Sequence, residues 1–240
     1  MDKFLILPSD DEIKNAIIQA FSLVSTYDDV NILLLLPTKK EMQLQGVIKF
    51  FGDLKVKKLI NGRIISLNGI PIRLESLRTF DVSDRRNSII IGIYPSKSMF
   101  DKLDDSGADA VIAVPSGMYE DVQEWIDTWN PQIYGKEKKT DEDAFIDNCV
   151  VENALKDLSI LIERPHLEKI MIRSSHDEGI TKGLFKFLYL KKEAFDPISI
   201  RRWAVTHDWD HESADMLKEI SQKVIEGRII RGSISMWTAE

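Results

Sequence analysis

Four short apolar segments that end in the same kind of dipeptide constrain the fold of this 240-residue chain most strongly. Each segment lacks charged residues, ends at proline followed by serine or threonine, and precedes residues with helical spacing. The four segments are Phe4–Ser9, Ile32–Thr38, Ser88–Ser96 and Ala110–Ser116. Strands that are buried on both faces of a parallel sheet and lead into helices have this pattern. The sequence therefore predicts a parallel sheet with four similar strand ends in the first half of the chain.

The segments between these strands predict helices and one interruption of the βα repeat. Ser9–Glu12 and Thr38–Glu41 both have the Ser/Thr-x-x-Glu form of a capping box, which begins a helix. Lys55–Ile60 is predicted as a third, shorter strand. Two alternating apolar runs then flank Asn68-Gly69, a strong signal for a two-residue hairpin. Because proline cannot donate a ladder hydrogen bond, Pro71 in the second run predicts that this strand lies at an edge of the sheet.

Consecutive right-handed βαβ units place helices on both faces of such a sheet. The predicted fold class is therefore α/β, with three α/β/α layers, a mostly parallel sheet and an inserted β-hairpin. This arrangement resembles the broad Rossmann-like group of folds, a resemblance that does not determine function. The chain has neither the G-x-G-x-x-G fingerprint nor a Walker-type G-x-x-x-x-G-K-[ST] loop. A conventional dinucleotide dehydrogenase or P-loop NTPase is therefore disfavoured.

A change of pattern after residue 135 predicts a second domain. Residues 136–143 contain no apolar side chain and are predicted to form a charged linker. Residues 144–240 show helical spacing, with a capping box at Ser175–Glu178 and a helix start at Asp196-Pro197. The predicted organisation is a Rossmann-like domain over residues 1–135, followed by an all-helical region over residues 144–240.

Composition limits the classes of partner. A formal net charge of -7 gives the chain no electrostatic attraction to nucleic acid or to anionic membranes. The single cysteine, Cys149, excludes an internal disulfide, and no apolar run approaches the roughly 20 residues that span a bilayer. The first residues also lack the features of a signal peptide. We therefore expect a cytoplasmic protein that binds neither nucleic acid nor membrane.

Ligands of open parallel sheets bind beyond the carboxyl ends of the strands, near the point where the strand order reverses. Helix N-termini at that edge favour anions, and neighbouring lysines add to this preference. The sequence thus predicts a small anionic ligand, such as a nucleotide, at this edge, and it does not identify a cofactor. The residues predicted to bind the ligand are Ser9, Thr38, Lys39, Ser96, Lys97 and Ser116.

Other functions stay open at this level. Serine and threonine cap helices wherever helices begin, so the same hydroxyl residues have an explanation without a ligand. Asp10 and Asp11 would repel a phosphate at the first strand end, although an acidic pair there can bind Mg²⁺. The three hypotheses are a regulatory module that binds a small anion or nucleotide, an assembly module that binds a protein partner or a second copy of the chain, and a Mg²⁺-dependent enzyme that uses Asp10 and Asp11 on a phosphate-bearing substrate.

Three further residues are candidates for a metal or ligand site. His207 and His211 have the i, i+4 spacing of a helical metal site, but they lie between two predicted helices. We therefore expect solvated turn residues there, and the sequence predicts no metal site. Gly92, inside a predicted strand, indicates the close approach of either a ligand or a packed helix.

Overall fold

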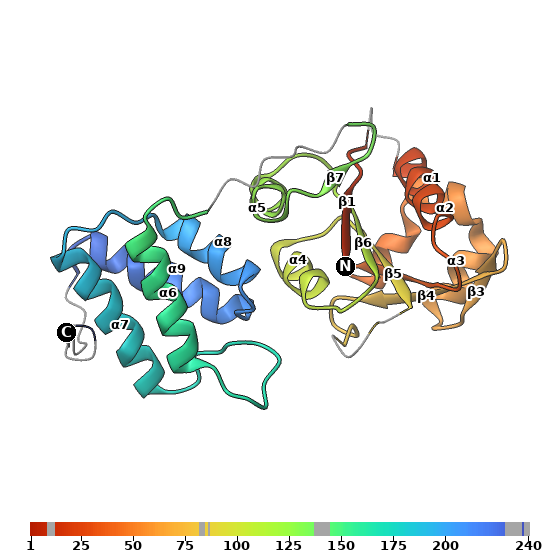
Figure 1. The fold of residues 1–240 in the computed structure, drawn as a ribbon. Helices are drawn as coiled ribbons and strands as arrows, with labels where there is room; N and C mark the ends of the chain where they lie inside the picture. Colours follow the sequence, from red (N-terminus) through yellow and green to blue (C-terminus); the bar gives the residue numbers. More distant parts are fainter. Residues whose placement is uncertain (9–12, 82–84, 86, 137–144, 229–236, 238–240) are drawn as a thin grey trace. The chain divides into compact units, whose positions relative to one another are not determined.

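A single sheet with the strand order β3-β4-β2-β5-β6-β1-β7 organises the first part of the chain in the computed structural model (Figure 1). The structure describes residues 1–8, 13–81, 85, 87–136, 145–228 and 237. Neighbouring strands are parallel except for β3 and β4. The strands are β1 (Asp2–Leu5), β2 (Asn31–Leu36), β3 (Ile65–Leu67), β4 (Ile70–Ser76), β5 (Ser88–Ile93), β6 (Ala110–Val114) and β7 (Gln132–Ile133).

The four look-alike segments form adjacent strands that run in the same direction. Asn31 of β2 pairs with Ser88 of β5, and Ala110 of β6 pairs with both Ile89 of β5 and Asp2 of β1. Strands β2, β5 and β6 are almost completely buried, as continuous apolar runs require. The predicted parallel sheet is confirmed, and the carboxyl ends of these four strands lie at one edge.

Helices cover both faces of the sheet and complete a three-layer α/β fold (Figure 1). One face packs against α1, α2 and α3, which bury Ile17, Val47 and Leu59 in a shared core. The other face packs against α4 and α5, which bury Leu103 and Trp125. The helices of this part are α1 (Ile13–Val24), the 3₁₀ helix η1 (Lys39–Gln43), α2 (Gln45–Phe51), α3 (Asp53–Ile60), α4 (Lys97–Asp104) and α5 (Glu120–Trp129).

The predicted strand at Lys55–Ile60 was wrong, because these residues belong to α3. Val56 and Leu59 are buried three positions apart, which is helical spacing. Asp53 lies in the first turn and Lys57 in the last, so both charges complement the helix dipole. Gly52 separates α2 from α3 with a φ of 79°, a conformation that glycine adopts without strain.

The hairpin forms, but its second strand does not lie at the edge. Strand β4 pairs antiparallel with β3 on one side and parallel with β2 on the other, so the edge strand is β3. Pro71 is tolerated because the pairing with β2 begins only at Ile72. The hairpin therefore extends the sheet and places β4 inside it.

Gly92 owes its place to helix packing. A Cβ atom at this position would lie 2.9 Å from Leu103 Cδ1 and 3.8 Å from Met99 Cε, both on α4. The glycine thus allows α4 to lie close to β5, and the alternative explanation by a ligand is not needed.

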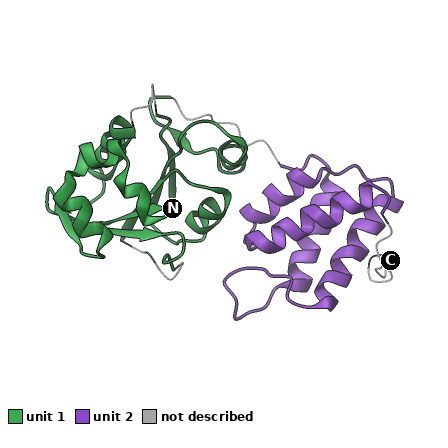
Figure 2. Ribbon diagram, turned by 180° about the vertical axis from the view of Figure 1, so that it is seen from behind, with its two compact units in different colours: residues 1–140 green, residues 141–240 purple. Residues whose placement is uncertain are grey.

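The chain divides into two compact units, unit 1 (residues 1–140) and unit 2 (residues 141–240) (Figure 2). The division falls inside the predicted charged linker 136–143, most of which lies outside the described residues. Unit 2 is helical, as predicted, with α6 (Cys149–Ile162), α7 (Ser175–Leu190), α8 (Pro197–Thr206) and α9 (His211–Ile225). Within the described ranges, none of the helices combines the length and the apolar character needed to cross a membrane.

Capping residues mark where the helices of unit 2 begin. Asn148 caps α6, which begins at Cys149, five residues beyond the start of the predicted helical region at residue 144. Ser174 and Asp177 form the capping box of α7, one residue before the predicted box at Ser175–Glu178. Asp196 caps α8 as predicted, with Pro197 in the first turn.

The core of unit 2 is centred on the fully buried Trp209. Its indole Nε1 donates a hydrogen bond to Ser159 Oγ at 2.9 Å, which joins the α8–α9 turn to α6. Between α8 and α9, Arg201 pairs with Asp215. Packing and polar contacts between separate helices therefore stabilise unit 2.

Candidate functional site

The carboxyl ends of the strands form the first candidate site, the carboxyl rim, which we define as the loops that follow β1, β2, β5 and β6. The connection after β2 joins the face that carries Met42 and Val47, whereas the connection after β5 joins the face that carries Met99. Adjacent strands β2 and β5 thus send their connections to opposite faces, where a ligand crevice is expected in an open α/β sheet. Thr38, Lys39, Ser96, Lys97 and Ser116 all follow strands that end here, while Ser9 lies outside the described residues.

Thr38 is engaged in a local capping box. Its Oγ1 accepts a hydrogen bond from Lys40 N at 3.3 Å, and its own N donates to Glu41 Oε2 at 2.6 Å. The Thr38 hydroxyl also lies 2.8 Å from Glu41 Oε2. The helix-capping alternative therefore accounts for Thr38, and the Glu41 carboxylate already supplies an anion at the start of η1.

An internal carboxylate also occupies the N-terminus of α4. Asp121 Oδ2, from the first turn of α5, accepts a hydrogen bond from Lys97 N at 3.1 Å. Ser96 Oγ lies 3.3 Å from Ser98 Oγ, and Ser116 is exposed. A ligand anion at α4 would have to replace Asp121 or bind beside it.

Tyr119 ties the loops after β5 and β6 together. Its hydroxyl donates a hydrogen bond to the carbonyl oxygen of Pro95. Burial, and to a lesser extent the charge of the nearby Asp121, raise the pKa of Tyr119 to about 12. The phenol therefore stays protonated near neutral pH and can act as the donor in this contact.

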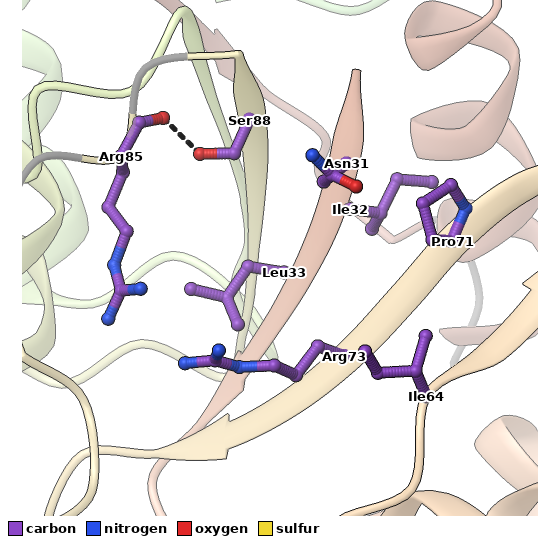
Figure 3. A pocket seen from close by; sticks show the side chains of 8 residues that line it. All are labelled: Asn31, Ile32, Leu33, Ile64, Pro71, Arg73, Arg85 and Ser88. Atoms are coloured by element: carbon purple, nitrogen blue, oxygen red, sulfur yellow. Dashed lines mark hydrogen bonds between the residues drawn. The ribbon is translucent and has the colours of Figure 1, made fainter. Parts of the chain in front are cut away.

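A second candidate site lies at the opposite, amino ends of the strands. It is a pocket of about 250 Å³ on the face of the sheet that also carries α4 and α5 (Figure 3). The connection from β4 to β5 contributes Phe80 to the core of this face. We call this site the arginine pocket, and its lining residues are Asn31, Ile32, Leu33, Ile64, Pro71, Arg73, Arg85 and Ser88.

Two guanidinium groups meet on the wall of the arginine pocket (Figure 3). Arg73 projects from β4, and Arg85 comes from the connection before β5. Arg85 Nε and Nη2 donate to the carbonyl oxygen of Asp81 at 3.1 and 2.7 Å, and Ser88 Oγ donates to the carbonyl oxygen of Arg85. These contacts fix Arg85, whose side chain is only 17% exposed, against 51% for Arg73.

Glu75 is the counter-ion of both arginines. Arg73 Nη2 donates a hydrogen bond to Glu75 Oε1, and Arg85 Nη2 lies 3.7 Å from the same oxygen. The Glu75 side chain is 7% exposed, and its buried Oε2 has no hydrogen-bond partner among the residues that the structure describes. Among the described residues, Glu75 therefore sets one negative charge against the two positive charges of Arg73 and Arg85.

The sequence of β4 contains a signal for this site. In β4, Ile72 and Leu74 point into the core shared with α1 to α3, so Arg73 and Glu75 must point to the other face. Two charged residues on one face of a strand that is apolar on its other face indicate an incompletely covered sheet.

A pocket of about 500 Å³ elsewhere in unit 1 surrounds a buried ion pair. Lys3 Nζ lies 3.0 Å from Asp104 Oδ1 and 3.7 Å from the centre of the Trp129 ring. Asp104 also accepts hydrogen bonds from the indoles of Trp125 and Trp129 at 3.0 and 2.8 Å. These partners join β1, α4 and α5, so a structural role accounts for this cluster.

The structure describes no metal centre. Among the described residues, no group of three or more His, Cys, Asp or Glu side chains is arranged to hold a metal ion. His207 stacks on Trp203 with ring centres 4.2 Å apart, and the buried His211 begins α9. Asp10 and Asp11, the residues of the Mg²⁺ hypothesis, lie outside the described residues.

Comparison with known protein families matches unit 2 alone. Residues 147–238 match the model of a domain of unknown function, DUF1889. The match includes α6 to α9 and covers less than half of the chain, so it supplies no activity for either unit. No curated protein and no solved structure matches the chain.

Proposed function

We propose that unit 1 is a regulatory module that binds a small anion and that the ligand occupies the arginine pocket. The observation that carries this proposal is the meeting of Arg73 and Arg85, from separate segments, on one pocket wall. Guanidinium groups bind carboxylates and phosphates through paired hydrogen bonds. Asn31 and Ser88 add an amide and a hydroxyl group to the same wall.

The carboxyl rim is the competing placement for the same ligand class. Its proposed residues remain Ser9, Thr38, Lys39, Ser96, Lys97 and Ser116. We favour the arginine pocket because Glu41 and Asp121 already serve as anions at the described helix starts of the rim. The module could still use the rim if a ligand displaced Asp121, so the experiment must compare both sites.

The test is a binding screen on the full chain, followed by substitutions at each site. Acetate, inorganic phosphate and adenosine monophosphate are titrated while the melting temperature and the NMR spectrum are recorded, since a ligand specific for the folded state raises the melting temperature. A bound anion should lose about 10-fold to 100-fold in affinity in Arg73→Gln or Arg85→Gln, the loss expected when a charge-assisted hydrogen bond of about 1.5–3 kcal/mol is removed.

Matched variants decide between the two placements. Arg78→Gln removes the same charge from an exposed arginine in the connection that carries Arg85 and should leave the affinity unchanged. Ser96→Ala and Lys97→Gln should also leave it unchanged. A loss of affinity in the Ser96 and Lys97 variants alone would move the site to the carboxyl rim. Because Arg85 also holds its own segment, circular dichroism must show that Arg85→Gln is folded.

A second candidate function is assembly through unit 2. Its helices leave several large apolar side chains exposed, among them Ile160 at 71% and Leu190 at 59%. Exposed apolar side chains of this size favour a protein partner or a second copy of the chain when they form a continuous patch. Light scattering of the wild type and of Ile160→Glu tests this function. If the chain self-associates through this surface, its apparent molar mass should be lower in the variant.

We propose a binding module in the cytoplasm and assign no catalytic residue. The Mg²⁺-dependent enzyme stays a separate hypothesis that depends on Asp10 and Asp11. Phosphatase activity that requires Mg²⁺ and disappears in Asp10→Asn would replace the binding proposal.

A further inference from the structure

We infer that the ligand of the arginine pocket is a small organic monoanion with an apolar body, such as a monocarboxylate, and that Glu75 sets this charge preference. The inference rests on the proposed function and narrows its ligand class. It uses three properties of the pocket, namely its charge, its apolar wall and its volume.

The charge of the described wall favours a single negative charge on the ligand. Arg73 and Arg85 each contribute a guanidinium group, and Glu75 contacts both through Oε1. One positive charge is thus left for the ligand. A dianion would bring its second charge close to the Glu75 carboxylate, and the repulsion between like charges is strengthened where one of them is buried.

The apolar part of the wall favours a ligand with a hydrocarbon body. Figure 3 shows Leu33 beside the two guanidinium groups, with Pro71 and Ile64 also lining the pocket. Ile64 is 65% exposed. A ligand body that covers Ile64 and Pro71 would remove this apolar surface from water.

The volume favours a small ligand. At about 250 Å³, the pocket is below the roughly 300–1,000 Å³ that is typical of pockets for drug-sized ligands. A nucleotide would extend beyond it, whereas an aromatic or short aliphatic acid fits its size. Charge, wall and volume therefore agree on a small amphiphilic acid.

Four probes of related shape test this inference on the full chain at pH 8, with affinities measured by NMR titration. Benzoate presents one negative charge on an apolar ring, and phenyl phosphate presents two negative charges on the same ring. Benzamide has the shape of benzoate without the charge, and acetate has the charge without the ring. We expect benzoate to bind at least 10-fold more tightly than each of the other three, and to lose at least 10-fold in Arg73→Gln.

Glu75→Gln provides the matched variant, because it keeps the shape of the side chain and leaves both positive charges unbalanced. We expect phenyl phosphate to bind this variant at least as tightly as benzoate does. If Glu75→Gln does not fold, the relative affinities of the wild type for the four probes are a sufficient test. Tighter binding of phenyl phosphate than of benzoate to the wild type would overturn the inference and leave anion binding intact. Failure of every anion to bind, or binding that is indifferent to Arg73→Gln, would instead refute the proposed function.

Discussion

Two helical glycines should respond to alanine in opposite directions, because only one of them touches another helix. Gly46 lies in the first turn of α2, and Gly179 lies inside α7. Alanine normally stabilises a helix by about 0.5–1 kcal/mol relative to glycine. A Cβ at residue 179 would meet nothing within 4 Å, so the helical preference should act alone there.

At Gly46 the contact with α1 makes the substitution by alanine destabilising. A Cβ atom there would lie 1.9 Å from Ile13 Cγ2, whereas real Cβ contacts stay beyond 3.0 Å. Ile13 is buried in the core, so its methyl group cannot move into water, and α1 and α2 must separate locally. Overpacking of this kind costs about 1–3 kcal/mol, which exceeds the gain in helix propensity. We expect Gly46→Ala to lower the stability of unit 1 by roughly 1–2 kcal/mol after that gain is subtracted.

Differential scanning calorimetry and urea unfolding of the full chain measure both effects. Gly179→Ala should raise the melting temperature of unit 2 by about 2–8 °C, since 1 kcal/mol corresponds to about 4–8 °C in a domain of this size. Gly46→Ala should lower the melting temperature of unit 1. If Gly46→Ala stabilised the chain as much as Gly179→Ala, the close contact between α1 and α2 would not exist and the reasoning would fail.

Further predictions concern the buried polar contacts. Burial by itself would raise the pKa of Asp177, but hydrogen bonds from Arg173, Ser174 and Arg164 outweigh it and hold the pKa below its usual value. The contribution of Asp177 to stability should therefore be complete above about pH 4 and be lost as the pH falls through the folded-state pKa, and urea unfolding at several pH values should show that Asp177→Asn lacks this dependence. Asp104→Ala should cost about 3–5 kcal/mol, because it removes the buried carboxylate that pairs with Lys3 and accepts hydrogen bonds from Trp125 and Trp129, and urea unfolding measures this loss. Ser159→Ala should cost about 1–3 kcal/mol by leaving the buried Trp209 N–H without its acceptor, with the loss read from thermal unfolding.

The parallel sheet could be predicted from the sequence because its signal is local and repeated. An apolar run that stops at Pro-Ser or Pro-Thr requires burial on both faces, and four such runs specify neighbouring strands of one sheet. The same local reasoning located the caps of η1 and α8. It failed at Lys55–Ile60, where six residues with two buried positions fit a short strand and a helix equally well until their packing is known.

The arginine pocket could not be predicted in this way because it depends on pairing between distant segments. Arg73 and Arg85 meet only because β4 inserts between β3 and β2, a position that no local pattern in the hairpin specifies. The carboxyl rim was predictable as a place, since parallel strands share an edge. The hydrogen bond from Lys97 N at the start of α4 to Asp121 could not be predicted, because Lys97 and Asp121 are 24 positions apart in the sequence.

The two edge strands limit how copies of this chain could join. Strand β3 has three residues and β7 has two, so each edge offers few unpaired backbone groups to another strand. Short edge strands are a common means by which natural proteins avoid joining sheet to sheet. A dimer or filament of this protein would therefore have to form through side chains on its helices, with a continuous intermolecular sheet disfavoured from the start.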